Sequence, residues 1–334
     1  MMRVDNLLLK RVLEEETLGE VFFSTIEGEA KPYATKVYDR EYIQGRPDLL
    51  NYLKAEITNL KILYHPNIIK LKEVKKSKRH FYLVMEYCNG GKLKVILDKY
   101  KEKNKCSFSE GIVQYIMRQI MSAMYYLHSM NIIHRDINLE NILLKFDSEE
   151  DKKNLNIMKS QIKIINFGSS VEISKEGNPL NIYPEPPLLC KSIFKKLGYD
   201  PKIDVWSLGS ICYEMLIGRA SFDAGDIIEL REKIEKGEYK IAAHLSREAI
   251  SFLNGMLQYD SSIRMSIEDL IKHSFLIDSI NNFHEIDLEL VSDKIKVGEI
   301  EIDTKREKKQ NIWSIFNKEE ELNKIIPVQI NQNH

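Results

Sequence analysis

The N-terminal part of the chain has the alternation of apolar and polar positions that is typical of β-strands. Five segments combine this period of two with β-branched or aromatic residues, and turn residues such as Gly28 and Pro32 lie between them. These segments span residues 7–13, 20–25, 33–38, 68–74 and 81–85. The pattern predicts a small, strand-rich part of the fold.

Other stretches show the period of three to four residues that amphipathic helices require. Residues 48–63 have an apolar face with Glu56 on the polar side, and the sequence His65-Pro66-Asn67 ends this helix. A second, longer helix is predicted for residues 110–130. Because helical patterns dominate after Gly90, a larger helical part is expected to follow the strands.

The bulk composition is that of an ordinary globular protein. The chain has 334 residues, and this length is enough for two lobes with their own cores. It contains 43% hydrophobic residues and has a formal net charge of −1. This charge predicts no nucleic-acid partner, and the basic run at residues 75–80 is interpreted as a solvated turn. No signal-peptide core and no apolar run of about 18 residues occurs, so we expect no membrane span. Four scattered cysteines without a Cys-x-x-Cys pair favour reduced thiols and a cytoplasmic location.

A short polar loop between two apolar flanks supplies the first candidate chemistry. His134, Arg135 and Asp136 are followed by four residues and then by Asn141. A carboxylate can accept or orient the proton of a hydroxyl group, and an amide oxygen can bind a metal ion. This spacing resembles the catalytic loop of the protein kinase family, which implies phosphoryl transfer from ATP to a protein hydroxyl.

Further motifs that resemble those of the protein kinase family follow in the family's order. They are Tyr33–Lys36 (the strand lysine motif), Met85–Cys88 (the hinge), Asn166–Gly168 (in place of Asp-Phe-Gly), Pro184-Glu185 (the end of the activation segment), Asp204–Gly209 (the central helix of the large lobe) and Arg264 (the position of the family's Arg that pairs with the Glu of Pro-Glu). The resemblance covers residues 7 to 276.

The resemblance implies an α+β, bilobal fold with three parts. The expected parts are an N-lobe with a small antiparallel sheet and one key helix at residues 1–86, a mainly helical C-lobe at residues 87–276 and an extension at residues 277–334. The stretch around Trp313 in this extension either docks on the large lobe or binds a partner. The two possibilities stay open.

The resemblance also assigns roles to individual residues. Lys36 would hold the α- and β-phosphates, Glu56 would orient Lys36, Asp136 has the base position, and Asn141 would bind the metal together with Asn166. The positions that contact the nucleotide are Lys36, Val21, Ala34, Met85 (the gatekeeper), Glu86, Cys88 and Leu143. The internal packing column consists of Leu60, Leu71, His134 and Phe167, anchored by Asp204. Arg135 would receive a phosphate from Ser169, Ser170 or Ser174.

Several departures from the family pattern fall on nucleotide and metal handling. Glu14-Glu15-Glu16-Thr17-Leu18-Gly19 replaces the Gly-x-Gly-x-x-Gly loop that cradles phosphates, and we interpret it as a solvated acidic hairpin. Asn166 replaces a metal-binding Asp and lacks the negative charge that Mg²⁺ prefers. Asn138 replaces the catalytic-loop Lys, and Asn178 replaces the Thr that braces it. ATP and Mg²⁺ are therefore expected to bind weakly.

This combination predicts a pseudokinase that acts as a scaffold or an allosteric partner of another protein. The alternative is a weakly active, divergent ATP-dependent serine/threonine kinase with a protein substrate, which would use Lys36, Asp136 and Asn141. A narrower resemblance, carried by residues 82–91, 127–129 and the polar insert 146–160, is to the autophagy-initiating kinases.

Overall fold

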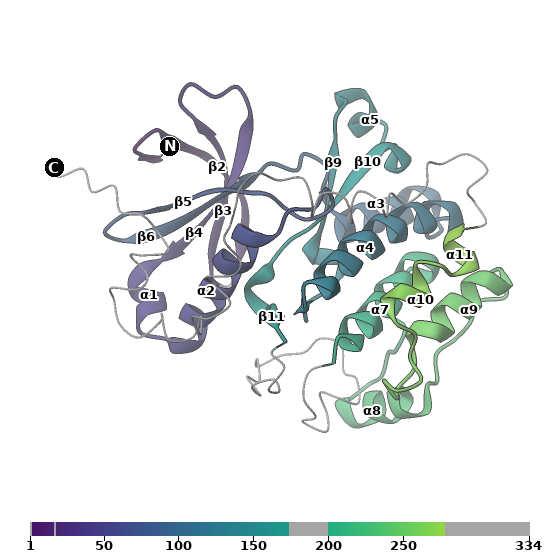
Figure 1. The fold of residues 1–334 in the computed structure, drawn as a ribbon. Coiled ribbons are helices and arrows are strands. Elements are labelled where there is room, and N and C mark those ends of the chain that lie inside the picture. The colour runs from purple at the N-terminus through teal and green to yellow at the C-terminus, as the bar shows by residue number, and fades with distance from the viewer. Residues whose placement is uncertain (1, 17, 174–199, 278–334) are drawn as a thin grey trace. The chain divides into compact units, whose positions relative to one another are not determined.

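The computed structural model describes residues 2–16, 18–173 and 200–277. The chain divides into two compact units, and Figure 1 labels their helices and strands. Among the described residues, those before Asp48 and those in Leu71–Glu86 belong to the first unit, and those in Asp48–Lys70 and from Tyr87 onward belong to the second. The sequence predicts an N-lobe that spans residues 1–86. In the structure, residues 48–70 group with the second, larger unit instead.

The first unit contains a six-stranded antiparallel sheet with the strand order β1-β2-β3-β4-β6-β5. Its elements are β1 (Met2–Val4), β2 (Leu7–Glu16), β3 (Gly19–Ile26), β4 (Pro32–Asp39), α1 (Arg40–Gln44), β5 (Leu71–Lys76) and β6 (His80–Glu86). The five predicted strands are present, while β1 and α1 were not predicted. β5 begins later than expected because Ile68 forms an isolated parallel bridge with Ile164 instead.

Alternation along β4 assigns its residues to two faces of the sheet. Tyr33 and Val37 belong to a buried apolar cluster on one face, together with residues of the neighbouring strands. The other members of this cluster are Leu7, Leu9, Ile26, Tyr82 and Val84, with Val4 and Phe22 packed against it. Ala34 and Lys36 have the opposite parity, so they lie on the other face of the sheet.

The second unit is mainly helical. Its helices are α2 (Pro47–Ile62), α3 (Leu93–Asn104), α4 (Glu110–Ser129), α5 (Glu149–Lys153), α7 (Lys202–Ile217), α8 (Ile227–Lys236), α9 (Arg247–Met256), α10 (Ile267–Leu270) and α11 (Ser274–Ile277), with short 3₁₀ turns at Leu139–Asn141, Ile157–Lys159 and Phe167–Ser169. β7 (Gly91–Lys92), β9 (Ile142–Phe146) and β10 (Ser160–Ile164) form one small sheet, and β8 (Ile132–Ile133) pairs with β11 (Val171–Glu172). Together with the sheet of the first unit, these helices confirm the α+β class.

The segment after α2 explains why this helix groups with the second unit. The Asn67 amide donates to Gln119 Oε1 on α4 (2.9 Å) and to the Ile162 carbonyl on β10 (3.0 Å). The His65 ring stacks on Tyr126, with 5.3 Å between ring centroids. The residues that were predicted to end the helix therefore also attach the end of α2 to α4 and β10.

The polar insert between β9 and β10 contains the short helix α5 and a 3₁₀ turn, and it connects the two antiparallel strands. Ser148 caps α5 by accepting hydrogen bonds from the backbone N–H groups of Glu150 and Asp151, and β9 pairs antiparallel with β10 on either side of the insert. Within the described residues, no helix is long and apolar enough to cross a membrane.

Candidate functional site

A buried carboxylate organises the loop that contains Asp136. Asp204 lies in the first turn of α7 and is fully buried, and it accepts hydrogen bonds from the backbone N–H groups of His134 (2.9 Å) and Arg135 (2.8 Å) and from His128 Nε2 (2.9 Å). Burial by itself raises the pKa of Asp204, but the hydrogen bonds from the His128 side chain and the His134 backbone act in the opposite direction, and the pKa lies below its usual value. Asp204 therefore fixes the backbone on which the loop is built.

His134 joins this loop to the Asn-Phe-Gly triplet. Its Nε2 lies 3.0 Å from the Ile165 carbonyl, and its ring packs edge-on against Phe167, with 4.9 Å between ring centroids. Burial is the largest influence on the pKa of His134 and lowers it. The neutral ring can donate from Nε2 while Nδ1 accepts from the Asp136 N–H (3.3 Å). The structural role predicted for His134 fits this packing.

The Asp136 carboxylate is surrounded by amide donors. Asn138 Nδ2 donates to its Oδ1, and Asn141 Nδ2 donates to its Oδ2, both at 2.8 Å. Asn138 Oδ1 also accepts from the backbone N–H groups of Glu140 (2.9 Å) and Asn141 (3.0 Å). Asn138 thus caps the following 3₁₀ turn, a local role that a Lys side chain cannot fill.

Asn166 completes this amide network. Its Nδ2 donates to Asp136 Oδ2 and to Asn141 Oδ1, each at 3.3 Å. Its backbone is left-handed, with φ 70°, and Asn tolerates this conformation better than most residues. The catalytic-loop residues predicted from the sequence, Asp136 and Asn141, are therefore brought together with the metal-position residue Asn166.

The arrangement does not fit a hard divalent cation. The predicted metal ligands are two neutral amides, and the N–H group of Asn166 points at the oxygen of Asn141 that a metal would use. Asn166 Oδ1 in turn accepts a hydrogen bond from the Tyr52 hydroxyl. Among the residues that the structure describes, no group of three His, Cys, Asp or Glu side chains could hold a metal ion.

Tyr52 is a site residue that the sequence interpretation missed. It lies on α2, and besides its bond to Asn166 its ring covers Gly168, where an added Cβ would come within 2.2 Å of ring atoms. Only a glycine fits beneath this ring without a shift. A possible sequence signal was the spacing, because Tyr52 precedes Glu56 by one helical turn and lies on the same face.

In the first unit, Lys36 forms an ion pair with a carboxylate of the replaced phosphate loop. Lys36 Nζ lies 2.8 Å from Glu16 Oε2, and the exposed fractions of the two side chains are 4% and 28%. The prediction of a solvated acidic hairpin therefore does not hold for Glu16, whose carboxylate is paired with Lys36. The physical reason is the pleat of β2, which directs Glu16 towards the face that carries Lys36.

Three residues of the predicted nucleotide set lie on the same face of this sheet. Val21 is the register partner of Lys36, and Ala34 is the register partner of Met85. Ala34 lies two positions before Lys36, so its side chain has the same direction. The sheet of the first unit thus places an apolar group beside the ion pair of Lys36 and Glu16.

The remaining predicted positions lie in different elements. Glu56 is buried on α2, Cys88 is buried after β6, Leu143 pairs with Lys92 between β9 and β7, and Glu86 ends β6. Lys36 and Glu56 belong to different units, so their pairing stays a prediction. The roles of these residues in nucleotide binding also stay predictions.

Some predicted features fall outside the described residues. These are Ser174, Asn178, Pro184-Glu185, Cys190 and the Trp313 stretch. Of their predicted partners, Arg135 donates from Nε to the Ser169 carbonyl, and Arg264 donates to the carbonyls of Gln258 (3.0 Å) and Lys202. Arg264 also packs over the Trp206 ring, with 5.2 Å to the ring centroid.

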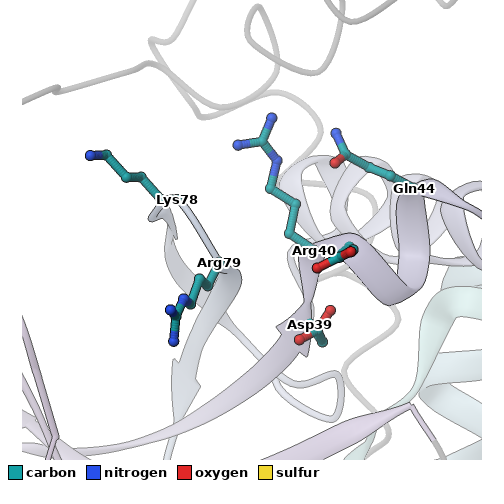
Figure 2. A pocket seen from close by; sticks show the side chains of 6 residues that line it. Asp39, Arg40, Gln44, Lys78 and Arg79 are labelled. Carbon is teal, nitrogen blue, oxygen red and sulfur yellow. The ribbon is translucent and has the colours of Figure 1, made fainter.

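A separate hollow of about 570 Å³ is present in the first unit (Figure 2). It is lined by Asp39, Arg40, Glu41, Gln44, Lys78 and Arg79. The two segments that form it are joined by a hydrogen bond from the Arg40 N–H to the Arg79 carbonyl (2.8 Å). Its lining mixes three cations with two carboxylates and includes none of the predicted site residues, so we assign it no part in the candidate site.

The chain is similar to known protein kinases. It is 28% identical over 279 residues to a probable serine/threonine-protein kinase of Dictyostelium discoideum (83% of this chain, 32% of the relative). It is 34% identical over 265 residues to calcium-dependent protein kinase 5 of Plasmodium falciparum (78% and 43%). It is 32% identical over 278 residues to CBL-interacting protein kinase 21 of Oryza sativa subsp. japonica (82% and 50%). The chain thus spans half the length or less of these relatives.

Residues 10–276 match the family model of the protein kinase domain. This match contains the loop around Asp136, the strand that carries Lys36 and the helix that carries Asp204. It confirms the predicted fold, which has an antiparallel sheet followed by a helical part. The chain therefore belongs to the protein kinase family.

Proposed function

We propose that the chain is a pseudokinase, a protein of the kinase fold that is catalytically silent or nearly so and acts as a scaffold or allosteric partner of another protein. The observation that carries this proposal is the direction of the Asn166 amide. Its N–H group donates to Asp136 Oδ2 and Asn141 Oδ1 at 3.3 Å each. A group that donates hydrogen bonds to these oxygens competes with a cation for them.

The losses at this site affect the charge needed for phosphoryl transfer. Kinases neutralise the transferred phosphoryl group with metal ions and a lysine. Asn166 and Asn138 remove one negative metal ligand and one cation, and the remaining amides satisfy one another. Losing one transition-state stabiliser typically costs about 10² to 10³ in rate. Losses within one functional unit are not additive, but the residual rate should be small.

The alternative is a weakly active, ATP-dependent serine/threonine kinase with a protein substrate. The defined orientation of the Asp136 carboxylate favours it, because two amides hold this side chain at 2.8 Å in a position where it could accept a hydroxyl proton. Lys36 and Asn141 are also retained. In this alternative Asn166 would be a poor metal ligand.

A thermal-shift titration separates these two functions. The full chain is melted with ATP alone, with ATP and Mg²⁺ and with ATP and Mn²⁺, because a ligand of the folded state raises the melting temperature. Transfer of radiolabelled phosphate to a generic protein substrate is measured in parallel, with Asp136→Ala as the control. The pseudokinase proposal expects no metal-dependent shift and no transfer. Transfer that Asp136→Ala abolishes would establish the active kinase instead.

Three finer points belong to this proposal. The similarity of residues 82–91, 127–129 and 146–160 to the autophagy-initiating kinases supports a place in that subfamily. The scattered cysteines support a cytoplasmic location. Partners and substrates of the whole protein are likewise proposals, since the chain matches 32% to 50% of the length of its relatives.

A further inference from the structure

Strand geometry divides the acidic run at the end of β2 between the two faces of the sheet. Glu14 is the register partner of Val21, and Glu16 is the partner of Gly19. Val21 is in turn the partner of Lys36 on β4. Since directly paired residues share a face and successive residues alternate, Glu14 and Glu16 lie on the face of Lys36, while Glu15 lies on the other face.

Glu16 is the member of the run that contacts the lysine. Its Oε2 lies 2.8 Å from Lys36 Nζ, which is hydrogen-bonding distance for a charge-assisted bond. The Lys36 side chain is only 4% exposed, whereas 28% of the Glu16 side chain is exposed. The ammonium group is therefore largely removed from water and has a carboxylate beside it.

The start of β3, at Gly19, is packed closely against β4. Gly19 has φ 155°, and a Cβ at this position would lie 2.0 Å from the Val37 carbonyl oxygen. A side chain there would push the start of β3 away from β4. Gly19 is also the register partner of Glu16, so the absence of a side chain at Gly19 lets this end of the β2–β3 pair lie close to β4, which carries Lys36.

A phosphate group would have to displace Glu16 or lie beside it. Carboxylate and phosphate oxygens make the same kind of charge-assisted bond to an ammonium group. If both were present, two negative charges would share one cation in a partly desolvated position, which disfavours the second anion. An uncharged ligand on the neighbouring apolar residues Val21, Ala34 and Met85 would not meet this repulsion.

We propose that Glu16 is a specificity-determining residue that occupies the anion position at Lys36. The chain then discriminates against nucleoside triphosphates and favours uncharged, nucleoside-like ligands at this face of the sheet. This inference deepens the proposed function, on which it rests, by naming the ligand class of the same site. The sequence departure at the phosphate loop is in this view the gain of an internal counter-ion as well as the loss of glycines.

Binding measurements without metal test the role of Glu16. The full-length wild type, Glu16→Gln and the matched control Glu15→Gln are titrated calorimetrically with adenosine and with ATP. Removing the competing charge should raise the affinity for ATP about tenfold in Glu16→Gln and leave the affinity for adenosine within about twofold. Glu15 lies on the other face and is exposed, so Glu15→Gln should bind both ligands as the wild type does.

A second variant and a double variant keep the test decisive. Glu16→Thr preserves strand propensity if Glu16→Gln fails to fold, and it should show the same gain for ATP. Adding Lys36→Met should abolish the gain, because Lys36 is the cation that the phosphate of ATP would contact. Equal gains for adenosine and ATP, a gain in Glu15→Gln, or no ATP binding by either Glu16 variant would each overturn the proposal.

The two proposals can fail separately. Phosphate transfer by the wild type with Mg²⁺ or Mn²⁺ would overturn the pseudokinase function, whereas the role of Glu16 is judged from metal-free affinity ratios alone. An unchanged affinity ratio in Glu16→Gln would remove the specificity role and leave the argument from the Asn166 amide as it stands.

Discussion

The surroundings of Lys36 and of Asp136 differ in how they satisfy a charged side chain. In the first unit, Lys36 has a counter-ion, since the Glu16 carboxylate lies 2.8 Å from its ammonium group. In the second unit, Asp136 is surrounded by the neutral amides of Asn138, Asn141 and Asn166 at 2.8 to 3.3 Å. One group is neutralised by an ion pair and the other is satisfied by hydrogen bonds.

If the proposed function holds, the difference illustrates two physical ways in which a ligand site can become independent of its ligand. An added opposite charge competes directly with an anion, and it can be removed again by a single substitution. A network of amides removes the charge that attracts a cation, and several hydrogen bonds must then be broken before a metal can enter. We therefore expect metal binding near Asp136 to be harder to restore by a single substitution than anion binding at Lys36.

The largest expected effect concerns the scaffold of the Asp136 network. Asp204→Asn replaces one carboxylate oxygen with an NH₂ group, which donates hydrogen bonds and cannot accept them. This group would face a backbone N–H group or His128, so at least one of these buried donors would lose its acceptor. The free energy of unfolding should fall by about 3 kcal/mol. Urea denaturation of both proteins measures this change. The surface variant Asp98→Asn is the control, with an expected change below about 1 kcal/mol. Equal losses would mean that Asp204 does not support the network.

The next effect concerns the sensitivity to acid of the second unit, to which His65 belongs. Burial, with a smaller contribution from the charge of Lys163, lowers the pKa of His65 from 6.5 to about 4. The folded protein keeps this ring neutral while the unfolded chain takes up a proton below pH 6.5. The contribution of the neutral His65 ring to the free energy of unfolding is therefore complete above pH 6.5. It is lost as the pH falls towards 4, and the total loss is about 3 kcal/mol.

Urea denaturation between pH 7 and pH 4 measures the contribution of His65. His65→Asn should show a shallower decline than the wild type, because its side chain keeps an acceptor for the Asn67 N–H but does not titrate. The exposed His244→Asn serves as the matched control. Parallel curves for the wild type and His65→Asn would contradict the prediction.

A smaller effect is expected when a negative charge is restored to the Asp136 network. Asn166→Asp replaces the donor that faces Asp136 Oδ2 and Asn141 Oδ1 with a carboxylate oxygen, so repulsion should lower stability by about 2 kcal/mol without metal. Mg²⁺ or Mn²⁺ should then raise the melting temperature of this variant, and should not raise that of the wild type. Asn51→Asp, at an exposed position of α2, controls for added charge. A metal response of the wild type would show that the amide network does not exclude cations.

The smallest effect concerns the hydroxyl group that closes this network. Tyr52→Phe removes the donor to Asn166 Oδ1 and retains the ring over Gly168, so we expect a loss of about 1 kcal/mol. The exposed Tyr42→Phe provides the comparison for a hydroxyl outside the network. Thermal or urea denaturation measures both variants. A loss no larger than that of Tyr42→Phe would separate Tyr52 from the network.

The sequence alone determined the family, the order of the elements and the candidate residues. Local periodicity predicts β4 and α4 because alternation and helical spacing follow from the nearest neighbours in the chain. The position of Asp136 and the departures at Asn138 and Asn166 are also local, since each belongs to a short motif with fixed spacing. Hence the fold could be predicted without coordinates, while the weakened metal site stays a prediction from these motifs.

Only the tertiary structure decided what these residues contact. Glu16 and Lys36 are separated along the chain and meet because β2, β3 and β4 pair in a particular register, and a shift by one residue would turn Glu16 to the other face. Tyr52 and Asn166 are 114 positions apart and meet only after α2 has packed within its unit. Neither contact has a local sequence pattern, because register and packing are set by the whole sheet and the whole core.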